Sequence, residues 1–447
     1  MKRFLSDYGM LLVLLLLCLF FSWVTWDQQY PAGEAAGRQV ARLVARQPLK
    51  TGSRVLIIAR PNEEDRQFAA ALQSRLEAGG LMVAEVVHGA PMDARRVLDR
   101  RATGASQSVE VVACSYAASQ WPVLRDLGAR WPALAFVPVV TPLPYYWPNF
   151  LKRENLLNVA NQISVIAILA IGMTMVIITA GIDLSVGCLI ALSAVVATLL
   201  IRDAAGAERA GALGMAACCL AAIGLCAAMG MFSGLMVTCF SIPPFIVTLG
   251  MMLVASGLAF ILAQGQSIYQ VPESFVWLGR GMTRLGVPNS VAMMFALYVL
   301  AHVMMSRTTL GRYIYAVGGN PEAARLSGVP VRGVLVFVYA ASGALAGLGG
   351  IVTASQLKSG SPTYGLMYEL YVIAAVVVGG ASLAGGQGRV FGTLIGALII
   401  AVIQNGMNLT GVESYTQKIV LGLVILGAVL LDKLKQQGFS RLRRRPR

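Results

Sequence analysis

VIAILAIGMTMVIITAGIDLSVGCLIALSA (Val165–Ala194) consists of two apolar runs that are separated by a short polar break. At their full apolar extent the runs cover residues 162–180 and 185–202. Each is about as long as an α-helix that crosses ~30 Å of hydrocarbon. Asp183 in the break is the only charged residue of the stretch, and charges are rare inside membrane spans. The stretch therefore indicates two consecutive transmembrane helices.

The same pattern recurs along most of the chain. The 447 residues are 57% hydrophobic and 13% charged, whereas soluble domains are roughly 45–50% apolar and about 25% charged. The mean hydropathy is +0.68. We predict an all-α polytopic membrane protein of about ten transmembrane helices, with an inserted small α/β domain that contains a parallel sheet. The predicted spans are residues 9–26, 162–180, 185–202, 211–237, 243–263, 290–306, 333–354, 370–384, 390–408 and 415–431.

The first apolar run, Gly9–Trp26, follows Lys2 and Arg3 and has two interpretations, a cleaved signal peptide or an uncleaved anchor. Signal peptides end at a site with small residues. The bulky residues Trp23–Asp27 offer no such site. We therefore predict that residues 1–26 form the first transmembrane helix.

Residues 27–148 differ from the rest because predicted strands alternate with predicted helices. Strands are predicted at residues 54–59, 81–87, 109–114 and 133–140, and helices at residues 63–77, 93–101 and around 121–127. Such alternation indicates a parallel sheet with helical crossovers. We predict an α/β domain at residues 27–148, a transmembrane domain at residues 149–432 and a basic tail at residues 433–447.

The formal net charge of +15 fits the positive-inside rule better than it fits nucleic-acid binding. Basic residues gather at Lys2 and Arg3, in the polar island Arg307–Arg332 and in the tail KLKQQGFSRLRRRPR (Lys433–Arg447). An even number of spans places both termini and the island in the cytoplasm and residues 27–148 outside it. We predict a multi-pass protein of the bacterial cytoplasmic (inner) membrane that contacts membrane lipid and has no nucleic-acid partner.

The sequence offers no pattern for chemistry of its own. Only Cys114 of the seven cysteines lies outside an apolar run, so no disulfide forms within the α/β domain. The two histidines, His88 and His302, are far apart, and no His/Cys spacing typical of a metal site occurs. No GxxxxGK[ST] loop is present. We predict no catalytic residue, no metal, no cofactor and no ATPase site.

The polar island contains a short helix with signals at both ends. Asn320 is a good N-cap, Pro321 suits the first helical position, and Glu322 favours the helix dipole. Gly328 can end the helix, and Pro330 prevents its continuation. On this pattern alone, an ordinary capped connector and a helix that docks on a cytoplasmic protein both stay open. The docking residues would be Asn320, Pro321, Glu322, Ala323, Ala324, Arg325, Leu326, Ser327 and Gly328.

Polar residues in or beside the spans are candidates for a translocation path. Asp183 has a simpler interpretation as the N-cap of the helix that begins near Leu184. Each of the other polar residues could instead make an interhelical hydrogen bond worth about 1 kcal/mol. Arg312 and Arg389 are candidates for contact with a cytoplasmic partner. The path candidates are Asn161, Gln162, Thr174, Asp183, Gln404, Asn405 and Asn408.

Four stretches occur in a fixed order: Val165–Ala194, LGRYIYAVGGNPEAARLSGV (Leu310–Val329), VVVGGASLAGGQGRVFGTLIGALI (Val376–Ile399) and NGMNLTGV (Asn405–Val412). Together they resemble the permease subunit of bacterial sugar ABC importers of the ribose, xylose and galactose type. The resemblance implies that residues 320–328 are the coupling helix that docks on a cytoplasmic ABC ATPase subunit. It also implies a second permease copy or paralogue and a periplasmic solute-binding protein as partners.

The α/β domain departs from this family, whose members typically join the first two spans by a short connection. Its first strand and GGLMV (Gly79–Val83) resemble half of a periplasmic sugar-binding protein of the ribose type. Three interpretations stay open: a docking platform for a separate binding protein, which we favour, a built-in partial receptor, and a structural remnant.

We therefore predict the permease subunit of an ATP-driven importer for a simple sugar or a similar small polar solute. A branched-chain amino-acid-type ABC permease, an ion-coupled secondary transporter and a membrane sensor are the alternatives. Acids, bases and histidines are scarce within the spans, which argues against ion coupling.

Overall fold

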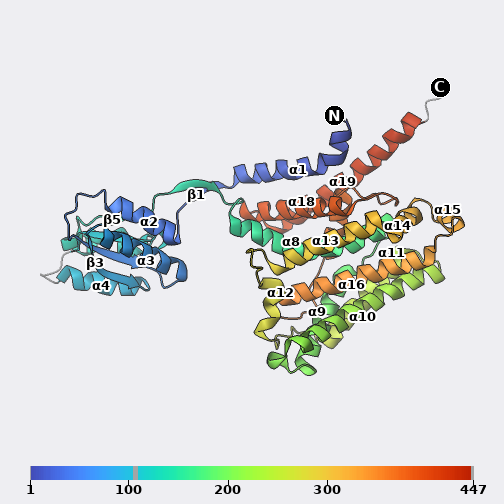
Figure 1. Ribbon diagram of the computed structural model, residues 1–447, viewed down its shortest axis with the longest axis horizontal. Coiled ribbons are helices and arrows are strands. Elements are labelled where there is room, and N and C mark those ends of the chain that lie inside the picture. The colour runs from blue at the N-terminus through green and yellow to red at the C-terminus, as the bar shows by residue number, and fades with distance from the viewer. Residues whose placement is uncertain (1, 104–108, 444–447) are drawn as a thin grey trace. The chain divides into compact units, whose positions relative to one another are not determined.

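The chain forms two compact units in the computed structural model, which describes residues 2–103 and 109–443. The helical unit comprises Met1–Thr25 and Asn149–Arg447, and the α/β unit comprises Trp26–Pro148 (Figure 1). The two segments of the helical unit meet where the α/β unit is inserted. There the backbone N–H of Asn149 donates to the Thr25 carbonyl at 2.9 Å, and that of Phe150 donates to Thr25 Oγ1 at 3.1 Å.

Nine helices of at least 18 residues account for most of the described part of the helical unit. They are α1 (Lys2–Val24), α8 (Arg153–Ile178), α9 (Val186–Asp203), α10 (Ala212–Cys239), α11 (Pro244–Leu262), α13 (Asn289–Arg307), α16 (Val331–Leu357), α18 (Val390–Leu409) and α19 (Ser414–Arg443). Shorter helices are α12 (Trp277–Arg280), α14 (Thr309–Gly319), α15 (Pro321–Leu326) and α17 (Tyr368–Val378).

Seven helices among the described residues are long and apolar enough to cross a membrane: α8, α9, α10, α11, α13, α16 and α18. This confirms a polytopic helical membrane protein. Shorter apolar helices occur at Gly9–Val24, Tyr368–Val378 and Ser414–Leu430, so the count of ten spans stays a prediction. Helix α19 continues from the last predicted span into the predicted tail, of which residues 444–447 lie outside the described residues.

The predicted span at residues 370–384 is wrong in its length. Helix α17 has 11 residues, and at 1.5 Å per residue it covers about 16 Å, roughly half the hydrocarbon thickness. Met367 before it has a left-handed backbone (φ +67°), and Gly380 beyond its C-terminal end has φ +92°. A continuous apolar run concealed these two breaks, because hydropathy does not register backbone conformation.

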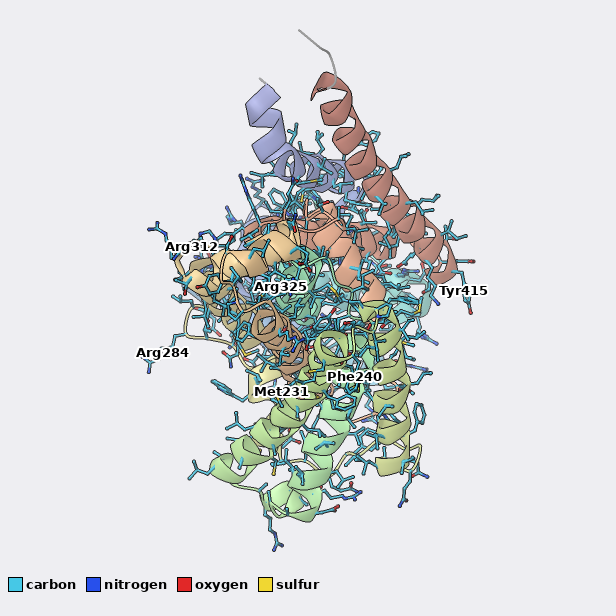
Figure 2. The ribbon with its side chains drawn as sticks, turned by 90° about the vertical axis from the view of Figure 1, so that its right-hand side faces the viewer. Met231, Phe240, Arg284, Arg312, Arg325 and Tyr415 are labelled. Carbon is cyan, nitrogen blue, oxygen red and sulfur yellow. The ribbon has the colours of Figure 1, made fainter. Side chains whose placement is uncertain are left out.

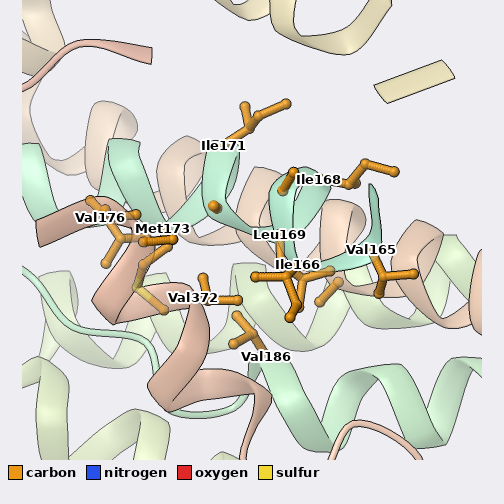
Figure 3. Close-up of a cluster of buried hydrophobic side chains, with 14 of the residues drawn as sticks. Val165, Ile166, Ile168, Leu169, Ile171, Met173, Val176, Val186 and Val372 are labelled. Atoms are coloured by element: carbon orange, nitrogen blue, oxygen red, sulfur yellow. The ribbon is translucent and has the colours of Figure 1, made fainter. Parts of the chain in front are cut away.

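The core of the helical unit surrounds α8, most of whose residues are buried. Figure 3 shows apolar side chains of α8 close to Val186 of α9 and Val372 of α17. Small residues let the neighbouring helices approach closely. A Cβ built on Gly343 of α16 would overlap the backbone oxygen of Cys226 in α10, and one on Gly396 of α18 would overlap that of Ala375 in α17. Glycine at these positions therefore allows the close contact of α16 with α10 and of α18 with α17.

The α/β unit contains a four-stranded sheet in the order β3-β2-β4-β5, in which every neighbouring pair is parallel. Alternate residues of β2 enter different cores. Val55 and Ile57 pack with helices α2 and α3, whereas Leu56 and Ile58 pack with α4 and the short helices after β4. The elements are β1 (Trp26–Gln29), α2 (Gly33–Val44), β2 (Arg54–Ala59), α3 (Glu63–Ala78), β3 (Met82–His88), α4 (Pro91–Thr103), β4 (Val111–Cys114), α5 (Tyr116–Ser119), α6 (Pro122–Arg125), α7 (Leu127–Arg130), β5 (Val139–Val140) and β6 (Tyr145–Pro148).

The strands predicted at residues 54–59 and 81–87 agree with β2 and β3, and the predicted parallel sheet is confirmed. The strand predicted at residues 133–140 is mostly wrong, because β5 has two residues and a 3-10 turn occupies Pro132–Leu134. Helix α2 and the antiparallel ribbon of β1 and β6 were not predicted. The ribbon strands are 116 or more residues apart, so no local pattern announces their pairing.

Candidate functional site

The polar island forms two consecutive helices, α14 and α15, each with a side-chain N-cap. Thr308 accepts a hydrogen bond from the backbone N–H of Gly311 at 3.2 Å. Asn320 Oδ1 accepts one from Ala323 at 3.0 Å. Helix α15 starts with Pro321 and is followed by Gly328 at φ +83°. The cap, the first helical residue and the terminating glycine are therefore confirmed, whereas α14 was not predicted as a helix.

Most residues of helix α15 are exposed. Leu326 is 84% exposed, whereas Ala324 is buried against the helical unit. Glu322 and Arg325 form an ion pair at 2.9 Å on the exposed face. Figure 2 looks onto the end of the helical unit at which α15 lies and shows Arg325 and the outward-pointing Arg312 of α14.

Helix α14 is held against the end of α8 and the loop before α18. A Cβ built on Gly318 would overlap the backbone oxygen of Ile178 and lie 2.7 Å from the nitrogen of Gly386. That same Ile178 oxygen accepts a hydrogen bond from Gly386 N–H at 2.8 Å. The hydroxyl of Tyr315 donates to the Gly388 carbonyl at 2.8 Å. Helix α14, which directly precedes α15, is therefore packed closely against the end of α8 and the loop before α18.

Asp183 joins the loop between α8 and α9 to α16. Its Oδ1 accepts from the backbone N–H of Ser185 at 3.0 Å and from the Ser185 hydroxyl at 2.6 Å, and its Oδ2 accepts from Ser342 of α16 at 2.8 Å. The carboxylate is almost fully buried. The predicted N-cap role of Asp183 is wrong, because α9 begins at Val186 and its N-cap is Ser185. The bonds from Ser185 to Asp183 instead close a turn ahead of the helix. The link to Ser342 spans 159 residues and has no local sequence signal.

Most other path candidates make hydrogen bonds between elements. Thr174 of α8 and Thr393 of α18 share one at 2.7 Å. Asn161 of α8 bonds to Ser290 of α13 and to Gln356 of α16. The remaining partners are Asn155 for Asn405 and Gln417 for Asn408, while Gln162 is exposed and Gln404 is half-buried. These residues are spread over the unit and do not converge on one point, and their role in a path stays a prediction.

Two polar residues that contact other helices of the unit were not predicted. Glu369 lies in the first turn of α17, and its carboxylate occupies the space where a Cβ of Gly187 would be. Gln356 ends α16 beside Asn161. Glu369 lies directly before the predicted span at residues 370–384. An acidic residue at that position is typical of the end of a span. Arg389 lies just ahead of α18, at the loop that receives α14.

The α/β unit has a cavity of about 130 Å³ at the carboxyl ends of β2 and β4. Arg60 binds Asp65 through two side-chain bonds, at 2.9 and 3.2 Å, and Ser115 donates to the same carboxylate at 2.5 Å. Burial alone would raise the pKa of Asp65, but the bonds from Arg60 and Ser115 outweigh it and lower the pKa below its usual value. Within residues 2–103 and 109–443, no group of three His, Cys, Asp or Glu could hold a metal ion.

Because the pKa of Asp65 is lowered, the stability of the α/β unit should decrease at acid pH. Asp65→Ala should reduce the free energy of opening of β2 by about 1–3 kcal/mol at pH 7, because it leaves buried donors without an acceptor. A depressed carboxyl pKa contributes stability that is present above the unfolded value of about 3.9 and is lost as the pH falls through the folded value. The difference between the wild type and the variant should therefore shrink below about pH 4.

Hydrogen exchange of the β2 amides in the full chain measures this difference. Asp126→Ala, at an exposed aspartate of the same unit, is the control and should change neither the protection nor its pH dependence. A difference in amide protection between the wild type and Asp65→Ala that stays constant down to pH 2 would contradict the lowered pKa of Asp65.

Comparison with known proteins places the helical unit among transport components. The family model described as branched-chain amino acid transport system, permease component, matches residues 155–429, more than half of the chain. The ribose import permease protein of Escherichia coli is 47% identical over 293 residues, which cover 65% of this chain and 88% of the relative. That of Bacillus subtilis is 42% identical over 315 residues, covering 70% and 94%.

A galactose/methyl galactoside import permease protein of Salmonella typhimurium is 37% identical over 298 residues, which cover 64% of this chain and 89% of the relative. No solved structure matches the chain. The family match begins after the α/β unit.

Proposed function

Because the chain belongs to the family of branched-chain amino acid transport system permease components, we propose that it is the transmembrane permease of an ATP-driven ABC importer for a sugar. Relatives that are named as sugar permeases align over most of their own length. The single observation in the structure that supports this function best is α15, a capped and exposed helix that follows α14, which packs against the end of α8.

Ribose is the solute that the comparisons favour. Two ribose import permeases reach 47% and 42% identity, and the galactose relative reaches 37%. Branched-chain amino acids are the second candidate, supported by the description of the family model. A neutral polyol needs hydrogen-bonding groups along its path.

Transport is driven by a separate cytoplasmic ATPase subunit that binds residues 320–328, the segment that contains α15. Leu326 supplies an exposed apolar contact, and the Glu322–Arg325 pair supplies polar contacts beside it. Such a small apolar centre with a polar rim is the usual anatomy of a binding hot spot. Arg312 lies on α14, next to this helix, and Arg389 lies just ahead of α18, at the loop that contacts α14. Both are further candidates for contact with the ATPase.

The orientation of the chain in the membrane follows from the cytoplasmic position of the ATPase. If α15 is cytoplasmic, the ends of α8 and α14 that meet at Ile178 and Gly318 are cytoplasmic too. The N-terminal end of α1 and the C-terminal end of α19 lie toward the same end of the helical unit (Figure 1). Both termini are then cytoplasmic, and the α/β unit, attached at Thr25 and Asn149, is extracytoplasmic. The fourteen arginines and lysines of residues 27–148 would not oppose this, because long segments translocate largely regardless of charge.

Transport occurs by alternating access in an assembly of two permease copies, or one copy and a paralogue. Movement of the ATPase displaces α15 and α14, and contact between Gly318 and Ile178 passes the displacement to the loop that holds Asp183. The hydrogen bond between Asp183 and Ser342 then passes the displacement to α16. The α/β unit serves as a docking platform for a periplasmic solute-binding protein.

Uptake in reconstituted vesicles tests the function. The chain, reconstituted with its ATPase and binding protein, should accumulate ribose only when ATP is supplied to the ATPase. Excess unlabelled ribose should compete, and leucine should not. Uptake that persists without ATP and stops when the proton gradient is dissipated would favour an ion-coupled transporter. Competition by leucine but not by ribose would favour the amino-acid alternative.

A further inference from the structure

The segment Lys358–Met367, between α16 and α17, is not helical. Lys358, Gly365 and Met367 have positive φ values of +54°, +72° and +67°. An antiparallel bridge joins Gly360 to Ile268. This backbone is thus irregular, and the half-length helix α17 follows it directly.

The irregular segment runs along the spanning helix α9. A Cβ on Gly360 would overlap the hydroxyl of Thr198, and one on Gly365 would overlap the backbone oxygen of Gly187. Thr198 and Gly187 belong to α9 (Val186–Asp203), one of the helices that can cross the membrane. Eleven residues separate them, so the segment follows α9 over about 16 Å of its length. The irregular backbone therefore lies at membrane depth.

Part of this segment has no cover from its own chain. Leu366 is 67% exposed, Met367 is 48% exposed and Leu370 is 41% exposed. Backbone groups cannot be satisfied by lipid, so irregular backbone at membrane depth occurs only where protein buries it or where it borders a water-filled cavity. Since the described residues of this chain leave it open, the segment needs water or a second molecule beside it.

Glu369 favours water over a dry protein contact. It is half-buried and stands at the start of α17, where free backbone N–H groups and the helix dipole stabilise a negative charge. It makes no ion pair among the described residues. Gly187 leaves the space that its carboxylate occupies. An ionisable side chain at such a depth faces a cavity or a pathway by default.

We propose, on the basis of the proposed importer function, that residues 363–370 line the water-filled translocation path and that Glu369 accepts hydrogen bonds from hydroxyl groups of the passing sugar. A carboxylate suits this role, because it can accept up to about four hydrogen bonds and polyols donate several. The path candidates from the polar residues of α8 and α18 are mostly engaged between helices, whereas this segment is open.

Cysteine accessibility tests the segment without requiring transport. In vesicles that contain the full chain with Cys239→Ala, Leu366→Cys should react at least about tenfold faster with a charged, membrane-impermeant methanethiosulfonate than Leu253→Cys, because only water sustains the reactive thiolate. Leu253 of α11 is a matched control, since it is 66% exposed and lies on a spanning helix. Equal rates would overturn the proposal, and so would protection of Leu366→Cys by a disulfide between two copies.

Uptake kinetics test Glu369 separately. Glu369→Gln keeps the shape but removes the charge, and it should raise the KM for ribose by about 10- to 100-fold, the loss expected for hydrogen bonds to a charged acceptor. The labelling rate of Leu366→Cys should not change. An unchanged KM would overturn the role of Glu369. If ribose is not transported even by the wild type, the proposed function fails, whereas the labelling result still decides whether this segment faces water.

Discussion

Glu322→Lys combined with Leu326→Asp should abolish retention of the ATPase by the detergent-solubilised permease and stop ATP-driven uptake. Leu326 is the most exposed apolar side chain of α15, and an aspartate there would place a charge in an apolar contact. Lysine at position 322 reverses the charge beside Arg325. Loss of a hot-spot contact costs about 2 kcal/mol or more, so each change should weaken binding at least about 30-fold. Co-purification and uptake measure the two effects.

Leu285→Asp is the control for this experiment. Leu285 is 88% exposed, like Leu326, but it lies in the loop between α12 and α13 and not in the polar island. The control should retain the ATPase fully. Retention by the α15 double variant as well would show that the motor grips the permease elsewhere.

Gly318→Ala should uncouple the permease from its motor, whereas Gly319→Ala should have little effect. The added methyl group at position 318 would overlap the Ile178 carbonyl, so α14 would have to move away from the end of α8. Such overpacking costs about 1–3 kcal/mol. A Cβ on Gly319 meets nothing within 4 Å. The pair therefore compares the same substitution at adjacent helical positions.

The measurement is the amount of ribose transported per ATP hydrolysed, together with the melting temperature in detergent. Gly318→Ala should lower the transport ratio several-fold more than Gly319→Ala, while both variants retain the ATPase. Equal transport ratios would mean that the contact between Gly318 and Ile178 does not carry the movement. Loss of ATPase retention in Gly318→Ala would mean that this contact positions α15 for docking.

Local signals predicted the elements that local chemistry determines. Asn320, Pro321 and Gly328 act through bonds within one helical turn, and the structure confirms each of them. The span at residues 185–202 coincides with α9 to within one residue at each end. In both cases the apolar length or the cap alone specifies the element.

The rest depends on contacts between distant parts of the chain. Ser342 meets Asp183 across 159 residues, and Gly318 meets Ile178 across a comparable separation. Glu369 was missed because its place at the start of α17 depends on the left-handed backbone at Met367, which composition does not indicate. The capped helix could therefore be predicted from the sequence, but its connection to other helix ends could not.

The bond between Thr25 and Asn149 has a consequence for the history of the chain. These two residues flank the α/β unit, Trp26–Pro148, and are hydrogen-bonded to each other. An insertion whose flanking ends are already joined leaves no gap when it is absent, and such points tolerate gain or loss of a module. A transporter of this kind can thus acquire an additional module as a single genetic event, without rebuilding any crossing of the membrane.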